Sequence, residues 1–352
     1  MIRVKIIGAG GYGGVGAIEL LRTHPEANVT AMVDVENVGT PYSDIYPHLK
    51  GFCDDAIVSP DDPLARETVD VVFLATPDRV GMKLADKEID NGAKVIDYSG
   101  DFRFNTSESY AEYARRLGLE TQHAAPQLLT RSAYGIAELH REEIADTSLV
   151  VGNPGCFAVS CILGLAPAMR EQVIEPRGVV CDCKTGVSGA GKKPNAVFHY
   201  PARYDQMNAY KLAGHQHVCE IERELGLLSG QDVVVTFTAQ VVPVCRGIMS
   251  TLYGRLTREL TEAQAFELYD AMYADEPFVH VHPSTAPIGS MQVRGTNRCN
   301  LVVSVDERAG ILRVVSYIDN LVKGQAGSAV QNMNVLFGLP ETMGLERPPT
   351  FP

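Results

Sequence analysis

Strand-like and helix-like patterns of hydrophobic residues alternate along the first part of the chain. Strands are predicted over residues 3–7, 29–35, 68–75 and 93–98, and helices over residues 15–21 and 79–91. The run at 68–75 is almost continuously apolar, which is typical of a strand buried on both faces of a parallel sheet. The alternation therefore predicts a doubly wound α/β domain of the Rossmann type over residues 1–153.

After residue 154 the pattern changes to longer strands with few helices between them. The predicted strands cover residues 178–184, 232–242, 248–255, 301–306 and 311–317, and the predicted helices cover residues 156–169, 261–273 and 324–337. This order indicates an α+β domain over residues 154–321 with a mainly antiparallel sheet. We expect the last helix to pack on the first domain, so that residues from about 322 to 352 complete that domain and make it discontinuous.

Composition and charge restrict the class of protein. The chain has 352 residues, which fits two domains of roughly 100–200 residues each. Its net charge of −12 argues against a general affinity for nucleic acid or an anionic membrane, so an anionic ligand needs a few local cations. No apolar stretch reaches the roughly 18 residues of a membrane span, and no signal-peptide layout is present. Eight scattered cysteines without a CxxC pair indicate reduced thiols, and we expect a cytoplasmic enzyme.

A glycine-rich turn joins the first predicted strand to the first helix. Gly8, Gly10 and Gly13 fit the pattern GxGxxG in the context of strand, turn and helix. Glycine lets the backbone approach a pyrophosphate closely, and the helix N-terminus supplies free N–H groups. The turn is therefore a candidate dinucleotide site, although a purely structural turn has the same pattern. Asp34 ends the second strand, 21 positions after Gly13, where an acidic residue favours the ribose hydroxyls of NAD over the 2′-phosphate of NADP.

The segment Asn153-Pro154-Gly155-Cys156 places a thiol at the predicted start of an apolar helix. The helix dipole and the free N–H groups at this end favour the thiolate form of a cysteine. The same N–H groups could hold an oxyanion. Cys156 is therefore a candidate nucleophile; the alternative is a small buried hydrophobic residue, the commonest role of a lone cysteine.

Two histidines follow at residues 215 and 217. His217 and Glu220 are three residues apart in a predicted helix, so the carboxylate can orient the imidazole ring. His217 is therefore a candidate acid or base. A metal site built on His215, His217 and Cys219 lacks a fourth ligand nearby, and we expect no metal.

Asp101-Phe102-Arg103 ends the predicted strand that begins at residue 93. This is the carboxyl edge of the sheet, where doubly wound folds bind their ligands. Arg103 could bind a phosphate or carboxylate there with its planar fork, and the alternative is an ion pair with Asp101. The glycine turn at residues 185–192 lacks the Gly-Lys-Ser/Thr order of a P-loop, which argues against ATP.

Together, these segments are similar to the motifs of one family. The matching segments are residues 8–14, 24–26, 101–103, 134–139, 153–156, 209–217, 318–324 and 329–334. They resemble the N-acetyl-γ-glutamyl-phosphate reductase family of arginine biosynthesis, which is related to aspartate-semialdehyde dehydrogenase. The family's glycine pattern falls on Gly8, Gly11, Tyr12 and Gly14, so the fit of Gly13 to GxGxxG is partly accidental.

The resemblance implies an NADPH-dependent reduction of N-acetyl-γ-glutamyl phosphate to the semialdehyde and phosphate, through a thioester on Cys156. His217 would be the acid/base, positioned by Glu220. The residue patterns and the resemblance together assign substrate binding to Arg103, Asn153, Lys211 and His215, and cofactor binding to Gly8, Gly11, Tyr12, Gly13, Gly14, Asp34, Ser188, Gly189 and Asn332. It also implies a homodimer or homotetramer acting on a small molecule.

Four segments depart from the family pattern. Phe157-Ala158-Val159 replaces Tyr-Pro-Thr, Gln216 replaces Arg, Val218-Cys219 replaces Thr-Pro, and Asp34 replaces Ser. The change at Asp34 keeps NAD open beside NADP. Three alternative functions also stay open: the same chemistry on a carrier-linked aminoadipyl phosphate or on aspartyl phosphate, a non-phosphorylating aldehyde dehydrogenase, and a catalytically inactive nucleotide-sensing regulator.

Overall fold

The chain forms two compact units in a computed structural model that describes residues 1–146 and 149–351. The first unit contains Met1–Pro154 and Gln325–Glu346, and the second contains Gly155–Gly324 and the tail from Arg347 onward. The sequence predicts that all residues from about 322 to 352 belong to the first domain. The tail instead groups with the second unit, where the backbone N–H of Thr350 donates to the carbonyl of Arg294 at 3.0 Å.

The first unit is built on a six-stranded sheet in the order β2-β1-β3-β4-β6-β5, with every strand pair parallel. The strands are β1 (Ile2–Ile7), β2 (Ala27–Val33), β3 (Val71–Leu74), β4 (Lys94–Asp97), β5 (Ser132–Tyr134) and β6 (Val150–Gly152). All four residues of β3 are buried, as the apolar run predicts. The parallel sheet confirms the predicted Rossmann-type domain.

Among the described residues, six α-helices of the first unit lie between these strands in sequence, and a seventh follows the strands of the second unit. The six are α1 (Tyr12–Leu21), α2 (Tyr42–Ile45), α3 (Gly81–Asp90), α4 (Ser107–Leu117), α5 (Pro126–Leu129) and α6 (Ala137–Asp146), and the seventh is α11 (Gly327–Leu336). The C-terminal helix α11 contacts α1, α6 and β4, and its ten residues are all buried. Because β4 already ends at Asp97, the Asp101–Arg103 segment lies in the turn after the strand and not in the strand itself.

The second unit contains a seven-stranded mixed sheet in the order β11-β12-β13-β10-β7-β9-β8. The strands are β7 (Arg177–Thr185), β8 (Asn208–Tyr210), β9 (Val234–Val241), β10 (Ile248–Arg255), β11 (Val279–Pro283), β12 (Cys299–Asp306) and β13 (Ile311–Ile318). The pairs β11–β12 and β7–β9 are parallel and the others are antiparallel. The predicted mainly antiparallel α+β domain is therefore confirmed.

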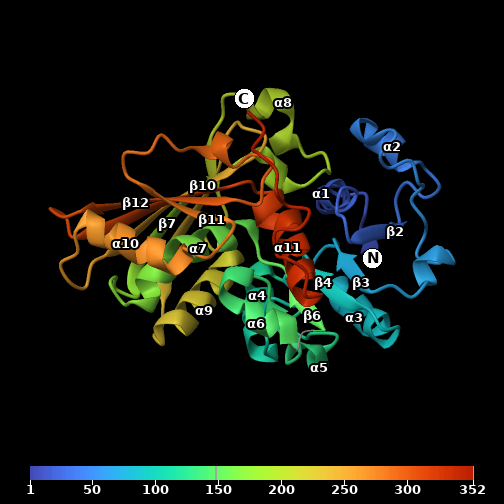
Figure 1. Ribbon diagram of the computed structural model, residues 1–352, viewed down its shortest axis with the longest axis horizontal. Coiled ribbons are helices and arrows are strands. Elements are labelled where there is room, and N and C mark those ends of the chain that lie inside the picture. The colour runs from blue at the N-terminus through green and yellow to red at the C-terminus, as the bar shows by residue number, and fades with distance from the viewer. Residues whose placement is uncertain (147–148, 352) are drawn as a thin grey trace. The chain divides into compact units, whose positions relative to one another are not determined.

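Helices cover one face of this sheet (Figure 1): α7 (Cys156–Arg170), α9 (His217–Ser229) and α10 (Glu262–Tyr273) contact its strands. Ser160 of α7 bonds Ser250 and Ser316 from two neighbouring strands, which identifies the covered face. On the opposite face, alternate residues of β10 and β13 such as Thr251 and Val315 stay partly exposed. The sheet therefore has one covered and one accessible face.

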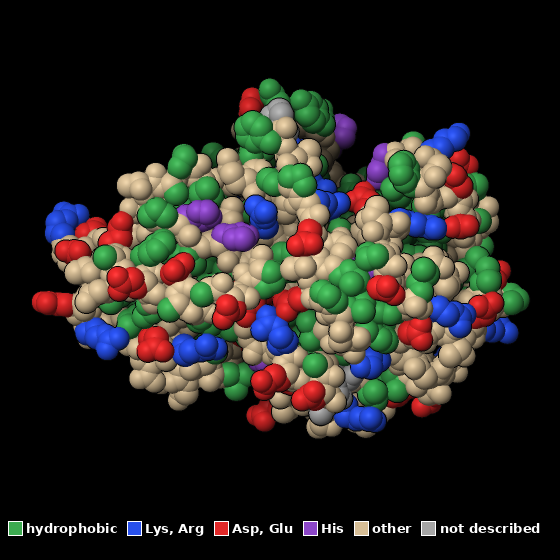
Figure 2. All heavy atoms as spheres, in the orientation of Figure 1, with side chains coloured by type: hydrophobic (Ala, Val, Ile, Leu, Met, Phe, Trp, Pro, Cys, Tyr) green, Lys and Arg blue, Asp and Glu red, His purple; other side chains and the backbone are tan. Residues whose placement is uncertain are grey.

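The surface carries no single dominant charge in the view of Figure 2, where acidic and basic side chains are intermixed. Hydrophobic side chains gather near α8 (Tyr200–Arg203), where Tyr200, Tyr204 and Met207 are exposed. Within the described residues, none of the helices has the length and apolar character that crossing a membrane requires.

Candidate active site

The glycine turn between β1 and α1 is closed by contacts that only glycine permits. Gly8 has φ +85°, and a Cβ there would lie 2.4 Å from the carbonyl oxygen of Ala75. A Cβ on Gly14 would lie 2.3 Å from the carbonyl oxygen of Ala9. Helix α1 begins at Tyr12, and its N-cap, Gly11, offers no side chain that could fill the space in front of the helix. The turn thus presents backbone N–H groups and a helix N-terminus, as a pyrophosphate site requires.

Buried polar atoms without a hydrogen-bond partner among the described residues lie near this turn. They are Thr76 Oγ1, Tyr98 Oη and Gln325 Oε1. A Cβ on Gly13 would lie 3.1 Å from the Tyr98 ring and 3.2 Å from Gln325 Nε2, and a Cβ on Gly8 would lie 3.4 Å from Thr76 Cγ2. Because buried polar groups are normally satisfied, this set indicates a polar ligand that completes the bonds. A dinucleotide, rich in hydroxyl and amide groups, fits.

The Asp34 carboxylate folds back onto the glycine turn. Its Oδ2 accepts from the backbone N–H of Gly10 at 2.8 Å. Its Oδ1 accepts from the N–H groups of Val35 and Glu36 at 2.7 and 3.1 Å. Asp34 is therefore held in place at the end of β2, and its charge lies beside the turn.

Asn153 is fixed from several sides within the first unit. Its carbonyl accepts from Arg103 Nε at 2.8 Å, its Nδ2 donates to the carbonyl of Gln325 at 2.9 Å, and its Oδ1 accepts from Asn332 Nδ2 at 3.2 Å. Arg103 is 7% exposed and also donates from Nη2 to the carbonyl of Tyr98 at 2.7 Å. The structure thus brings Arg103, Asn153 and Asn332 together.

Cys156 is the first residue of α7 in the second unit, as the sequence predicts. The preceding N-cap, Gly155, has an extended backbone. The His217 ring packs on Gly155, because a Cβ there would lie 2.3 Å from His217 Nε2. Gly324 also lies against the cysteine: a Cβ on Gly324 would lie 2.7 Å from Cys156 Cβ. The Cys156 thiol therefore lies at a helix N-terminus, and the His217 imidazole packs on the residue that precedes it.

Glu220 links the histidine helix to the thiol turn. Its Oε2 accepts from the backbone N–H of Gly155 at 3.0 Å, and its Oε1 lies 4.0 Å from His217 Nε2. The side chain is fully buried. The sequence predicts that Glu220 orients the His217 ring, and the structure adds a direct hydrogen bond from Gly155, the residue before Cys156.

His215 packs in an aromatic pocket beside His217. The two ring centroids are 4.8 Å apart, and the rings of Phe157 and Phe237 lie 5.6 and 5.0 Å from His215. Burial lowers the pKa of His215 to about 2, with smaller contributions from His217 and Lys211. His215 is therefore a neutral ring across the ordinary pH range.

Lys211 has a left-handed backbone with φ +49°, an uncommon conformation for a residue with a Cβ. Its Nζ donates to Gln216 Oε1 at 2.8 Å. An arginine at position 216, as in the family pattern, could not accept this bond. Gln216, which stands where the family pattern has an arginine, thus provides the acceptor for Lys211.

Ser188 and Gly189 lie in the short 3₁₀ turn Val187–Ala190 after β7. The Ser188 hydroxyl accepts from Asn320 Nδ2 at 3.0 Å, and its backbone N–H donates to the carbonyl of Cys245 at 3.0 Å. This turn is therefore held by the loops around residues 245 and 320.

Sequence reasoning missed Thr76, Tyr98, Gln325 and Tyr210 as site residues. Thr76 could have been found, because it lies two residues after the buried strand β3, at the carboxyl edge of a parallel sheet. Tyr210 has a ring 5.7 Å from His215, and burial raises its pKa, with the Cys156 and Cys183 charges contributing. Only the fold brings Tyr98 and Gln325, far apart in sequence, to the same glycine turn.

Comparison with known proteins agrees with both units. A family model described as "Semialdehyde dehydrogenase, NAD binding domain" matches residues 3–147, and one described as "Semialdehyde dehydrogenase, dimerisation domain" matches residues 156–320. The chain is 42% identical to the N-acetyl-gamma-glutamyl-phosphate reductase of Citrifermentans bemidjiense over 353 residues and 39% identical to that of Brevibacillus brevis over 352 residues. Each alignment covers 100% of both chains.

Solved structures share the fold at low sequence identity. Aspartate semialdehyde dehydrogenase II of Vibrio cholerae, complexed with ASA, has a TM-score of 0.72 at 17% identity and is aligned over 96% of this chain and 98% of that one. Aspartate semialdehyde dehydrogenase of Candida albicans, with NADP, has a TM-score of 0.69 at 14% identity over 95% and 98%. With full-length relatives at 39–42% identity, the chain belongs to the N-acetyl-gamma-glutamyl-phosphate reductase family.

Proposed function

We propose that this chain reduces N-acetyl-γ-glutamyl phosphate to the semialdehyde and phosphate, through a thioester on Cys156. The carrying observation is the arrangement in the second unit: a cysteine at a helix N-terminus, a histidine ring packed on the preceding glycine, and a carboxylate bonded to that glycine's N–H. A thiol, a base and an orienting acid are the components of nucleophilic catalysis. Family membership supports the substrate.

The reaction needs one covalent intermediate. The Cys156 thiolate forms a bond to the acyl carbon and the bond to phosphate breaks, which leaves a thioester and inorganic phosphate. A reduced nicotinamide, when bound, supplies a hydride. His217 takes the thiol proton at the start and donates it to the oxygen of the tetrahedral species that precedes the aldehyde. It then takes the hydroxyl proton back as the aldehyde forms. When the carbon–sulfur bond breaks, Cys156 is regenerated.

We assign the remaining roles from the contacts around each residue. Arg103 binds the departing phosphate, and its bonds to two backbone carbonyls support this role because they fix the plane of the guanidinium. Asn153, Lys211 and His215 bind substrate. A neutral His215, held by burial, is suited to a hydrogen bond with the acyl group and not to proton transfer near pH 7.

For the hydride donor we propose NADPH, with NADH also accepted. A nicotinamide dinucleotide would be held by the turn of Gly8, Gly11, Tyr12, Gly13 and Gly14 in the first unit, together with Asn332, and by Ser188 and Gly189. The family supports NADPH. The Asp34 charge beside the turn opposes a 2′-phosphate, which is why we expect NADH to be used as well.

We also propose that the chain works as a homodimer or homotetramer in the cytoplasm. The second unit matches a dimerisation-domain family model, and the sheet in this unit keeps an accessible face with alternate partly exposed residues such as Thr251, Val315 and Tyr317. A second copy on this face would cover those side chains.

A reverse assay tests the substrate. Purified protein is mixed with N-acetylglutamate semialdehyde, NADP⁺ and phosphate, and NADPH formation is followed. We expect activity that requires phosphate and that falls by about 100-fold or more with aspartate semialdehyde, which lacks a methylene and the acetyl group. A preference for aspartate semialdehyde, or activity without phosphate or arsenate, would contradict the proposal.

A further inference from the structure

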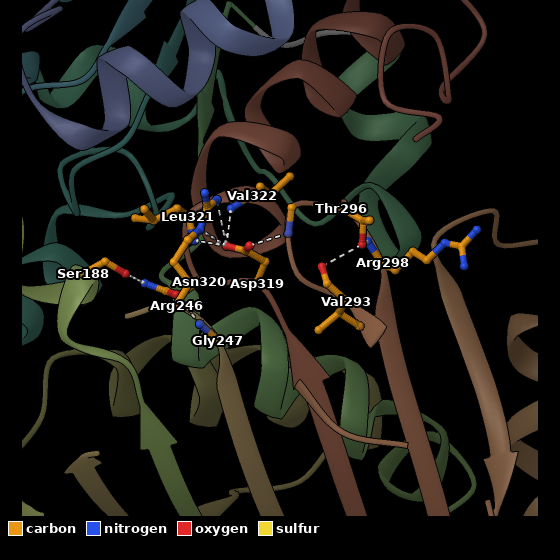
Figure 3. Close-up of polar contacts among 11 residues, drawn as sticks. Ser188, Arg246, Gly247, Val293, Thr296, Arg298, Asp319, Asn320, Leu321 and Val322 are labelled. Carbon is orange, nitrogen blue, oxygen red and sulfur yellow. Dashed lines mark hydrogen bonds and ion pairs between the residues drawn. The ribbon is translucent and has the colours of Figure 1, made fainter. Parts of the chain in front are cut away.

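Asp319 directly follows β13, and its buried carboxylate accepts five hydrogen bonds (Figure 3). Oδ1 accepts from Arg246 Nε and Nη2 at 3.3 and 3.1 Å. It also accepts from the backbone N–H groups of Leu321 and Val322 at 2.9 and 3.3 Å. Oδ2 accepts from the backbone N–H of Gly295 at 2.7 Å. With 0% of the side chain exposed, this charge is neutralised by one cation and fixed by three backbone donors.

The backbone of Asp319 connects the same residue to the thiol. Its carbonyl oxygen accepts from the N–H of Gly324 at 3.0 Å, which closes a turn from Asp319 to Gly324. Gly324 is in contact with Cys156, since a Cβ there would lie 2.7 Å from Cys156 Cβ and 3.5 Å from the carbonyl oxygen of Asp319. One face of the thiol residue is therefore bounded by a turn that the Asp319 side chain and carbonyl both hold.

Asn320 extends this network to a second loop. Its Oδ1 accepts from the N–H of Gly247 at 2.8 Å, and its Nδ2 donates to Ser188 Oγ at 3.0 Å (Figure 3). Arg246, which is bonded to Asp319, precedes Gly247 in the same loop. Asp319 and Asn320 thus join the loops at residues 188, 246 and 295 to the turn against Cys156.

We propose that Asp319 is the positioning residue for the Cys156 thiol, acting through the turn that ends at Gly324. The role of Cys156 as nucleophile rests on the proposed function. The Arg246 cation neutralises the Asp319 carboxylate, so that this buried charge is not left unpaired in the network that holds the turn. An Asp319→Asn substitution removes the carboxylate charge that pairs with Arg246. It also places an amide N–H₂ donor where the neighbouring N–H groups already point, so the turn from Asp319 to Gly324 must rearrange.

The test compares Asp319→Asn with Asp306→Asn, a matched change at the other end of the same β-hairpin. Asp306 Oδ1 accepts from the N–H of Ala309 in the turn between β12 and β13. Two quantities are measured on folded protein: steady-state kcat and KM, and the rate at which iodoacetamide alkylates the peptide containing Cys156, followed by mass spectrometry from pH 6 to 9. Alkylation needs neither substrate nor cofactor.

For Asp319→Asn we expect kcat to fall on the order of 10- to 100-fold while KM changes by less than about threefold. The alkylation rate of Cys156 should change by more than about threefold at some pH in the range, with Asp306→Asn like the wild type. The proposal is overturned if the Cys156 alkylation rate and kcat of Asp319→Asn both stay within about twofold of those of Asp306→Asn. It is also overturned if only one of the two quantities changes. If wild-type protein does not reduce the acyl phosphate, the proposed function fails, and the alkylation result alone decides the role of Asp319.

Asp319→Asn could fail to fold, and Arg246→Lys then decides. Lysine keeps the charge and loses the planar Nε and Nη2 pair. We expect the Cys156 alkylation rate of this variant to differ measurably from that of the wild type, and kcat to fall by at least about threefold. Unchanged alkylation and kcat in Arg246→Lys would overturn the proposal.

Discussion

Two histidines, two positions apart, have different surroundings in the second unit. His215 is held neutral by burial, since its pKa is lowered to about 2. His217 begins α9 and packs on the glycine before the thiol. These surroundings support the proposed roles, substrate binding for His215 and proton transfer for His217.

We expect His217→Asn to lower kcat by about 10²–10⁴-fold and to remove one limb of its pH profile. His215→Asn should keep that limb, because a group whose pKa lies near 2 does not titrate between pH 5 and 9. The pH dependence of kcat for both variants checks this. Loss of the limb in His215→Asn alone would mean that the two roles are exchanged.

The Asp34 charge should set the cofactor preference. Asp34→Ser removes an anion beside the glycine turn, so the ratio of kcat/KM for NADPH to that for NADH should rise by about 10-fold, the effect of roughly 1.4 kcal/mol. The wild-type ratio should be above one. A wild-type ratio below one would make NADH the donor, and an unchanged ratio in Asp34→Ser would show that the carboxylate does not act on the ribose.

At the scale of elements, hydrophobic periodicity predicted the strands and helices well where tertiary contacts did not alter their ends. β10 (Ile248–Arg255) matches its predicted range. Helix α10 (Glu262–Tyr273) begins one residue after its predicted start, next to a capping box formed by Thr261 and Gln264. The start of the last helix was predicted at residue 324, whereas the structure has a π-helical turn, Val322–Ala326, before α11. That turn follows the Asp319 network, whose bonds join residues far apart in sequence.

In the candidate site, too, local sequence predicts some features, whereas others depend on tertiary contacts. A turn and a helix pattern identified Cys156 and His217 from local sequence, because each lies at a helix start. The hydrogen bond from Gly155 to Glu220 depends on how elements pack, which periodicity does not encode. The same holds for the oxygens of Tyr98 and Gln325, which have no hydrogen-bond partner in the described part of the chain.

The contact between α7 and α9 leaves no room for a side chain at Gly155. Gly155→Ala would place a methyl group 2.3 Å from His217 Nε2, so the start of α9 must move. We expect kcat to fall by about 10²-fold, with a folded protein and little change in KM for NADPH. Gly289→Ala is the control, because its added Cβ has its nearest neighbour at 3.6 Å. Equal kcat in the two variants would show that the ring and the thiol turn are not coupled.

At the scale of the whole molecule, the accessible face of the second unit's sheet bears on assembly. Val315 lies in β13 between Thr251 and Val302, and it is partly exposed on this face. If a second copy covers the face, Val315→Glu buries a charge in the interface and should shift the protein toward monomer. Light scattering after gel filtration measures the shift, with Leu227→Glu on exposed α9 surface as the control. Identical masses for both variants would place the interface elsewhere.

The central claim is the thioester on Cys156, and a single-turnover experiment tests it most directly. Wild-type protein and Cys156→Ala are each mixed with N-acetyl-γ-glutamyl phosphate without a nicotinamide cofactor, and released phosphate and protein mass are measured. We expect about one phosphate per active site and an acyl group on the peptide containing Cys156 in the wild type, and neither in the alanine variant. Phosphate release that persists in Cys156→Ala, or an acyl group found on another residue, would contradict the account.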